Sequence, residues 1–299
     1  MSPTSLASAS RILWRMLKRN GVDPGCVFRE ARLDPALMDD PRGRYPIENV
    51  RAAWLEGVRL IPDPCFGLQA AGIWRPTDFH ALGYAFLASR TLRIALERIV
   101  RYNTVVDPVI HFRDELDDRR LQLTYHSDRP DLPDPPAREN ARWAAVLGMC
   151  REIHGSDLDP LEAAFTHDAP SCRGDFFELF RCPIHFNAPV SRLVFDRAQM
   201  ERPLPAANQE LALASDGILR AYVDDLQHDD DLISRVKAAV IDHLPSGAPS
   251  AELIAKDLYL SPRTLQRRLA EEDISYSRLL ETVRRELAEQ YVGDSARSL

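Results

Sequence analysis

The sequence lacks the features that would place the protein in or across a membrane. No stretch of about 18 consecutive apolar residues occurs, so no transmembrane helix is expected. The first 21 residues do not read as a signal peptide, because Ile12, Leu13, Met16 and Leu17 alternate with basic residues, as in an amphipathic helix. We therefore expect a cytoplasmic protein without a membrane partner.

Cysteine is scarce and scattered. Five cysteines lie at positions 26, 65, 150, 172 and 182, and no C-x-x-C pair occurs. In a chain of this length the pattern is typical of reduced thiols in the cytosol. His167, Cys172, Cys182 and His185 are close in sequence, but their spacings match no standard zinc pattern. We predict no metal site and no cofactor.

Motifs of the common enzyme classes are also missing. The chain contains no G-x-S-x-G, no P-loop and no G-x-G-x-x-G. Asp114, Glu115, Asp117 and Asp118 cluster where a turn is expected, and a solvated turn explains them better than an acid–base pair. We predict that the protein is not an enzyme.

What is present is the composition of a globular protein with a sizeable core. The 299 residues are 45% hydrophobic and 28% charged. The net charge of −7 argues weakly against a surface covered by nucleic acid, but it does not exclude a local basic helix. We predict an α+β domain over 1–205, a connector over 206–230, and an all-α domain over 231–299.

The hydrophobic period changes along the first domain. Residues 47–61 and 91–102 carry apolar stripes at helical spacing, and a long helix is expected over 137–154. PVIHFRDELDDRRLQLTYHS instead alternates, which predicts a hairpin that turns at Asp117 and Asp118. LEAAFTHD predicts another strand and CRGDFFELFRC a short helix. PIHFN and SRLVFD predict a second strand pair.

The connector carries one helix, ELALASDGILRAYVDDL, with apolar residues on one stripe. Leu211, Ile218, Leu219 and Tyr222 of this stripe fit a dimer contact. They fit packing against a flanking domain equally well.

Two short helices joined by a turn are predicted over 250–270. Ser250 is a suitable N-cap for the first helix, and Ser261 for the second, where Pro262 takes the first helical position. Leu265 and Leu269 lie four residues apart and face the partner helix. This is a helix-turn-helix arrangement.

The outer face of the second short helix is basic. It carries Arg263, Gln266 and Arg267, with Arg268 at the edge, and no acidic residue occurs between Ser261 and Ala270. Arginine can donate two hydrogen bonds to guanine, and glutamine can pair likewise with adenine. By spacing alone, a helix that reads the major groove and a solvated basic face are equally good interpretations.

AKDLYLSPRTLQRRLAEEDISYSRLLETVRRELAEQYV resembles the first helix-turn-helix and the following helix of the AraC/XylS family of bacterial transcription regulators. One departure is Asp273, where the family usually has glycine. The resemblance implies that base contacts fall on Arg263, Gln266 and Arg267. The residues that we predict at the DNA interface are Ser261, Arg263, Thr264, Gln266, Arg267 and Arg268.

A second resemblance covers the N-terminal part. ALGYAFLASRTLRIALERIVRY and LFRCPIHFNAPVSRLVFDRAQMERPLP are similar to family members whose N-terminal domain is called arabinose-binding-like. This implies a domain that senses a small effector or dimerises. Effector pockets are mostly apolar with few polar groups. The aromatic residues that fit the lining of such a pocket are Trp54, Trp74, Tyr84, Phe86, Tyr102 and Trp143, although most of them also fit an ordinary core. Our candidates for effector contact are Trp74, Tyr84, Tyr102 and Trp143.

Family members carry two helix-turn-helix units joined by a long helix. Here the chain ends after GDSARSL, about where the second unit is expected to begin. We therefore expect a C-terminally truncated member whose one unit reads one major-groove segment with reduced affinity.

Together these observations predict a cytoplasmic, homodimeric regulator that binds double-stranded promoter DNA, responds to a small-molecule effector and contacts RNA polymerase. The alternative is a truncated module that binds ligand or dimerises without productive DNA binding.

Overall fold

The structure is a computed structural model that describes residues 3–227, 232–244, 247–258 and 260–295. The chain divides into two compact units, Met1–Val223 and Asp224–Leu299. The boundary between the units falls within the predicted connector, 206–230. Within the described residues, no helix is long and apolar enough to cross a membrane.

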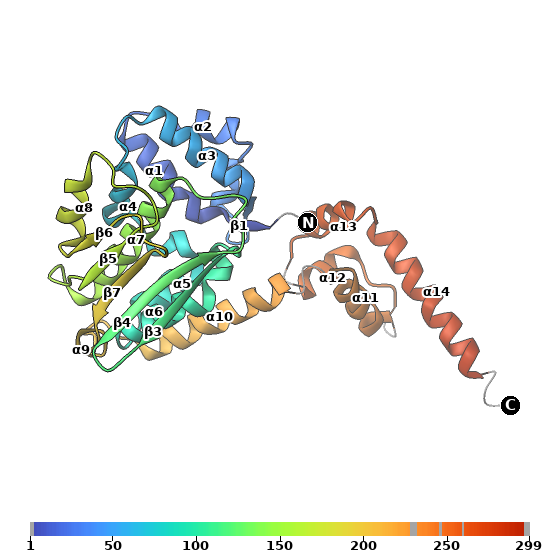
Figure 1. Ribbon diagram of the computed structural model, residues 1–299. Coiled ribbons are helices and arrows are strands. Elements are labelled where there is room, and N and C mark those ends of the chain that lie inside the picture. The colour runs from blue at the N-terminus through green and yellow to red at the C-terminus, as the bar shows by residue number, and fades with distance from the viewer. Residues whose placement is uncertain (1–2, 228–231, 245–246, 259, 296–299) are drawn as a thin grey trace. The chain divides into compact units, whose positions relative to one another are not determined.

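The first unit is built on a five-stranded sheet (Figure 1). Its strands in spatial order are β3 (Ile110–Leu116), β4 (Arg120–Ser127), β7 (Arg192–Asp196), β5 (Glu162–Ala164) and β6 (Ile184–His185). Strands β3 and β4 form the predicted hairpin, with Ile110 opposite Ser127 and Leu116 opposite Leu121. Asp117 closes the turn, because its Oδ1 accepts hydrogen bonds from the backbone N–H groups of Arg119 and Arg120.

The predicted second strand pair is wrong. Strand β7 does not pair with β6 but lies between β4 and β5, antiparallel to both. Strand β6 instead runs parallel to β5 at the edge of the sheet. Apolar alternation identified both strands correctly, but it carries no information about which strand lies beside which.

Helices make up most of the rest of the first unit. The longer ones are α1 (Arg11–Arg19), α2 (Pro24–Glu30), α3 (Ile47–Leu60), α5 (His80–Leu87), α6 (Leu92–Val106), α7 (Pro136–His154) and α8 (Arg173–Phe180). Two single turns, α4 (Ala70–Ile73) and α9 (Arg197–Met200), and a short strand pair, β1 (Thr4–Leu6) with β2 (Arg44–Pro46), complete the unit. Helix α7 lies deep in the main core of the first unit, because its Trp143, Leu147 and Cys150 side chains are fully buried there.

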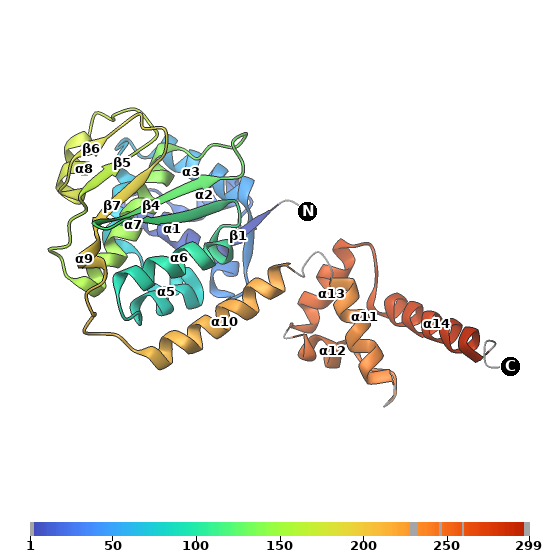
Figure 2. The ribbon, with the colours of Figure 1, turned by 60° about the horizontal axis from the view of Figure 1, so that its bottom comes forward.

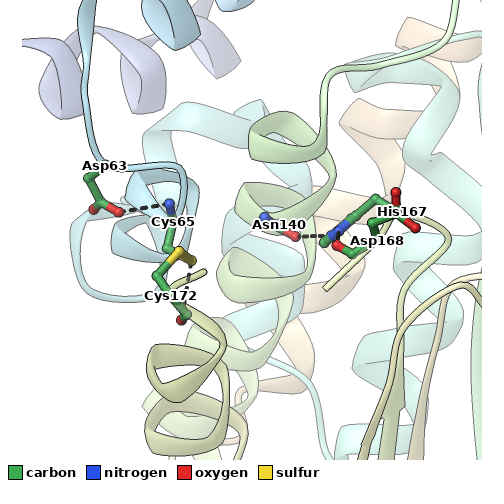
Figure 3. Close-up of a disulfide and its surroundings, with 6 residues drawn as sticks. All are labelled: Asp63, Cys65, Asn140, His167, Asp168 and Cys172. Atoms are coloured by element: carbon green, nitrogen blue, oxygen red, sulfur yellow. Dashed lines mark hydrogen bonds between the residues drawn. A yellow bond between two sulfur atoms is a disulfide. The ribbon is translucent and has the colours of Figure 1, made fainter. Parts of the chain in front are cut away.

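The prediction of five reduced cysteines is wrong at two positions. Cys65 and Cys172 form a disulfide, although 107 residues separate them in the sequence (Figure 3). The fold brings the segment before α4 against the start of α8, a proximity that residue spacing could not indicate. Cys26, Cys150 and Cys182 are free thiols.

Helix α10 (Gln209–Gln227) lies alongside α5 and α6 in both views (Figure 2). Arg98 of α6 donates two hydrogen bonds to the carboxylate of Asp216, at 2.9 and 2.8 Å. Leu219 and Tyr222 are buried, whereas Leu211 is 46% exposed and Ile218 is 53% exposed. The predicted stripe is therefore divided: one part packs on the first unit, and the other faces outward.

The second unit is entirely helical in its described residues. Its helices are α11 (Leu232–His243), α12 (Ala251–Asp257), α13 (Pro262–Glu271) and α14 (Tyr276–Ser295). A separate small core holds them together, with Val236, Ile254, Leu265, Leu269 and Val283 fully buried.

Candidate nucleic-acid interface and ligand cavity

Helices α12 and α13 form a tight pair whose starts are capped as the sequence predicts. Ser250 Oγ accepts a hydrogen bond from the backbone N–H of Leu253 at 3.2 Å, and Ser261 Oγ accepts one from Thr264 at 3.1 Å. Pro262 occupies the first position of α13, where a missing N–H is tolerated. Residue 259 in the turn lies outside the described residues.

The end of α13 explains the unusual Asp273. This residue adopts a left-handed backbone with φ of 55°, a conformation that favours glycine. Its N–H donates to the carbonyl of Ala270 at 3.1 Å, and the N–H of Ile274 donates to Leu269 at 3.0 Å. These two hydrogen bonds define a Schellman motif, which aspartate can complete at a modest conformational cost.

The two faces of α13 differ sharply. Leu265 and Leu269 are fully buried against the small core, while Arg263, Gln266 and Arg267 are exposed on the opposite side. Arg267 forms an ion pair with Glu271 one turn later, at 2.6 Å. The helix therefore presents two arginines and a glutamine to solvent, while its leucines pack into the small core.

The remaining predicted interface residues lie at the margins of this face. Ser261 is exposed and caps the helix, and its hydroxyl lies 2.7 Å from that of Thr264. Thr264 and Arg268 are half-buried. DNA contact by these residues stays a prediction.

The first unit contains an apolar cavity of about 130 Å³. Its walls come from the N-terminal segment, α1, α3, α5, α6, β3 and α7. Apolar lining side chains include Leu6, Trp54, Leu82, Ile99, Phe112 and Met149. Ala141 and Ala145 of α7 also line it, and their small size leaves part of the space open.

One group of charged residues also lines this cavity. Arg138 contacts Asp107 at 3.0 Å and Asp134 at 2.6 Å, and Arg142 contacts Asp134 at 3.0 Å. Burial opposes ionisation of Asp134, but the two arginines outweigh it and hold its pKa below the ordinary value. Of these, Asp107, Arg138 and Arg142 line the cavity directly.

Sequence reasoning did not identify this group. The available signal was the pair Arg138 and Arg142, four residues apart on a helix with few other charges on that face. A second cavity of about 280 Å³ shares Asp107 and Arg138 with the first and is lined by more polar side chains, including Arg51, His126, Arg129 and Glu139.

None of the four predicted effector residues lines the apolar cavity. Trp74, Tyr102 and Trp143 are buried in the surrounding core, and Tyr84 is 42% exposed on α5. Trp54, which the sequence also suggests for such a pocket, lines the cavity. Effector contact by the four residues stays a prediction.

The histidines and cysteines at 167–185 do not come together as a ligand set. His167 Nε2 lies 2.8 Å from Asn140 Oδ1, and Cys172 is in the disulfide (Figure 3). Among the described residues, potential metal-ligand atoms converge within 4.8 Å at Asp63, Cys65, Cys172 and Asp175. Two of those atoms are the bonded sulfurs, and a disulfide sulfur is not the thiolate that metals bind.

Comparisons with known proteins place the N-terminal part of the chain in a family of transcription regulators. Residues 21–204 match the family described as the N-terminal arabinose-binding domain of AraC transcription regulators. The chain is 25% identical to the ornithine utilization regulator of Pseudomonas aeruginosa, over 97% of this chain and 84% of that protein.

Two further similarities extend over nearly the same length. The HTH-type transcriptional regulator VirS of Mycobacterium tuberculosis is 29% identical, over 93% of this chain and 82% of that protein. The crystal structure of the transcriptional regulator CdpR from P. aeruginosa has a similar fold, with a TM-score of 0.51 and 22% identity. The match covers 94% of this chain and 85% of that one.

Proposed function

Because the chain belongs to the family of AraC transcription regulators, we propose that it binds promoter DNA sequence-specifically and responds to a small-molecule effector. The observation that carries the DNA-binding part is the exposed face of α13, with Arg263, Gln266 and Arg267 opposite two buried leucines. In this proposal α12 and α13 are a helix-turn-helix, and α13 is its recognition helix.

The chemistry of that face supports recognition of base edges. Each bidentate arginine or glutamine contact discriminates against a wrong base by about 1–3 kcal/mol. The ion pair of Arg267 with Glu271 is exposed, and such pairs contribute at most about 1 kcal/mol, so a guanine can compete for the guanidinium.

A homodimer is the working form that we propose. Leu211 and Ile218 project from one flank of α10. Ala214 lies between them on this flank and Ala221 follows Ile218, all at helical spacing. Pairing of two copies would present two recognition helices to two half-sites. The bound regulator would then alter transcription through contact with RNA polymerase.

DNA fragments selected from genomic DNA by the parent protein, together with a random duplex, provide the test. Fluorescence anisotropy measures the affinity of each variant for both. Arg263→Ala and Arg267→Ala should each reduce the preference for the selected fragment by a factor worth about 1–3 kcal/mol. Arg202→Ala removes the same charge from an exposed site in the first unit and serves as the control. If both α13 variants keep the parental preference, α13 is not the recognition helix.

Sedimentation velocity tests the dimer. Ile218→Glu should shift the protein toward a monomer because it places a charge on the apolar flank. Leu213 is 55% exposed on the other side of α10, so Leu213→Glu should leave the dimer intact. A parent protein that is monomeric at micromolar concentration would contradict the proposal.

A further inference from the structure

The apolar cavity has the size of a small organic ligand. An engineered protein cavity of about 150 Å³ with apolar walls binds benzene, and the cavity here measures about 130 Å³. A ligand of roughly six to eight non-hydrogen atoms therefore fits it. Most of the lining is apolar, with Leu6, Trp54, Ile99 and Phe112 among it, so a mainly apolar ligand suits the cavity better than a sugar or an amino acid, which carries several polar groups.

A buried hydrogen-bond donor belongs to the cavity wall. Among the described residues, five buried polar side-chain atoms have no hydrogen-bond partner. Arg142 Nη1 is the one of these that belongs to a residue lining this cavity. A buried donor without a partner is costly, so an acceptor atom brought by a ligand would relieve that cost.

The charges around Arg142 indicate that this acceptor is uncharged. Arg138 and Arg142 are matched by Asp107 and Asp134, with separations from 2.6 to 3.8 Å. Glu139 is another buried carboxylate, and it lines the second cavity together with Asp107, Asp134 and Arg138. A ligand carboxylate would bring a further negative charge into a site that is already balanced, whereas a carbonyl oxygen needs one hydrogen bond.

The cavity also borders the residues that hold α10. Arg44 Nη1 donates to the carbonyl of Val105 at 2.9 Å, and the next two residues, Val106 and Asp107, line the cavity. Arg44 Nε donates to Thr4 Oγ1 at 2.9 Å, and Ser5 and Leu6, which follow Thr4, also line it. The same guanidinium donates to Tyr222 of α10. A ligand in the cavity thus touches two segments that Arg44 connects to α10.

From this juxtaposition we propose that the cavity is the effector site and that the effector is a small, neutral, mainly apolar molecule with one acceptor oxygen, such as a ketone. Its oxygen accepts a hydrogen bond from Arg142, and its hydrocarbon part fills the space beside Ala141 and Ala145. The regulatory part of this inference rests on the proposed function, whereas ligand binding does not depend on it.

Three ring compounds that all lie within this size limit test the inference on the whole chain: cyclohexanone, cyclopentanecarboxylate and cyclohexylammonium. Isothermal titration calorimetry should show one cyclohexanone bound per chain. The carboxylate should bind at least about tenfold more weakly, and the ammonium compound should not bind. No saturation by cyclohexanone at about 10 mM would overturn the site. Binding of the ammonium compound with the same affinity as cyclohexanone would also overturn the site. Tighter binding of the carboxylate would overturn the neutral ligand class.

Two variants locate the binding. Ala145→Leu fills the cavity and should weaken cyclohexanone binding by about tenfold or more. Ala238→Leu is the matched control, because Ala238 is an exposed helical alanine in the second unit. Arg142→Met removes the hydrogen-bond donor and keeps an unbranched side chain. This substitution should also weaken the binding of cyclohexanone. Cooperative thermal unfolding shows whether each variant is folded. Unchanged binding by folded Ala145→Leu would place the ligand elsewhere.

A separate anisotropy measurement with selected DNA distinguishes the two proposals. If the protein binds the selected DNA but does not bind the ketone, the effector site is overturned and the proposed DNA-binding function stands. If the protein binds the ketone but shows no preference for any DNA sequence, the proposed DNA-binding function is overturned and the ligand site stands.

Discussion

Arg44 Nη1 donates a hydrogen bond to the hydroxyl of Tyr222 at 3.2 Å, which joins strand β2 to helix α10. The same guanidinium also donates to Thr4 and to the carbonyl of Val105. Tyr222 is buried and packs against the ring of His80, with 5.1 Å between the ring centroids. Arg44 therefore links α10 to two segments that adjoin the cavity.

Arg44→Met should separate ligand binding from the DNA response. The substitution removes donors to Thr4, Val105 and Tyr222, so we expect α10 to lose its polar connection to the cavity wall. Cyclohexanone affinity should change by less than about threefold, while its effect on DNA affinity should be abolished. Arg101→Met is the control, because Arg101 is an exposed arginine on α6. A full DNA response in Arg44→Met would show that Arg44 does not transmit the signal.

Glu271→Gln should strengthen DNA binding. Glu271 holds Arg267 in an exposed ion pair, and such pairs at this spacing contribute about 0.3–0.5 kcal/mol. The substitution releases Arg267 and removes a negative charge near the phosphates, so affinity should rise by about twofold at low salt. Anisotropy titrations at two salt concentrations measure the gain, which should shrink as salt increases. Glu281→Gln removes an exposed charge from α14 as a comparison. An affinity below that of the parent would contradict this role for Glu271.

Reduction of the Cys65–Cys172 disulfide should destabilise the first unit. A cross-link over 107 residues limits the unfolded chain, and disulfides of this kind contribute about 2–4 kcal/mol to the free energy of unfolding. Guanidinium denaturation should show that loss when reductant is added to the parent. Cys65→Ser should be as unstable as the reduced parent and insensitive to reductant. Cys26→Ser replaces an exposed free thiol, so this variant should lose as much stability on reduction as the parent does.

Stability should fall at acidic pH through His80. Burial lowers the pKa of His80 below its ordinary value of 6.5, and the neighbouring Arg42 lowers it further. Since the unfolded chain then binds a proton more readily, this contribution is present above pH 6.5 and is lost as the pH falls toward the folded-state pKa. His80→Asn should remove this part of the pH dependence of Tm, because asparagine does not titrate in this range. Parallel Tm curves for parent and variant from pH 8 to pH 5 would show that His80 does not contribute.

Local features were predictable because they depend on neighbouring residues. The caps Ser250 and Ser261, the turn at Asp117 and the buried leucines of α13 all follow from residue type and period. The outer face of α13 follows for the same reason, since a helix whose apolar stripe is buried must expose the opposite side. DNA contact itself remains a prediction.

Features that join distant segments were not predictable. The sequence alone set the helices, most strands and the basic face of α13, because each of these is decided within a few turns of the chain. Only the tertiary structure decided that β7 lies between β4 and β5, that Cys65 meets Cys172, and that a cavity opens beside Arg142. Those outcomes depend on how whole surfaces pack, and packing combines residues from many segments at once.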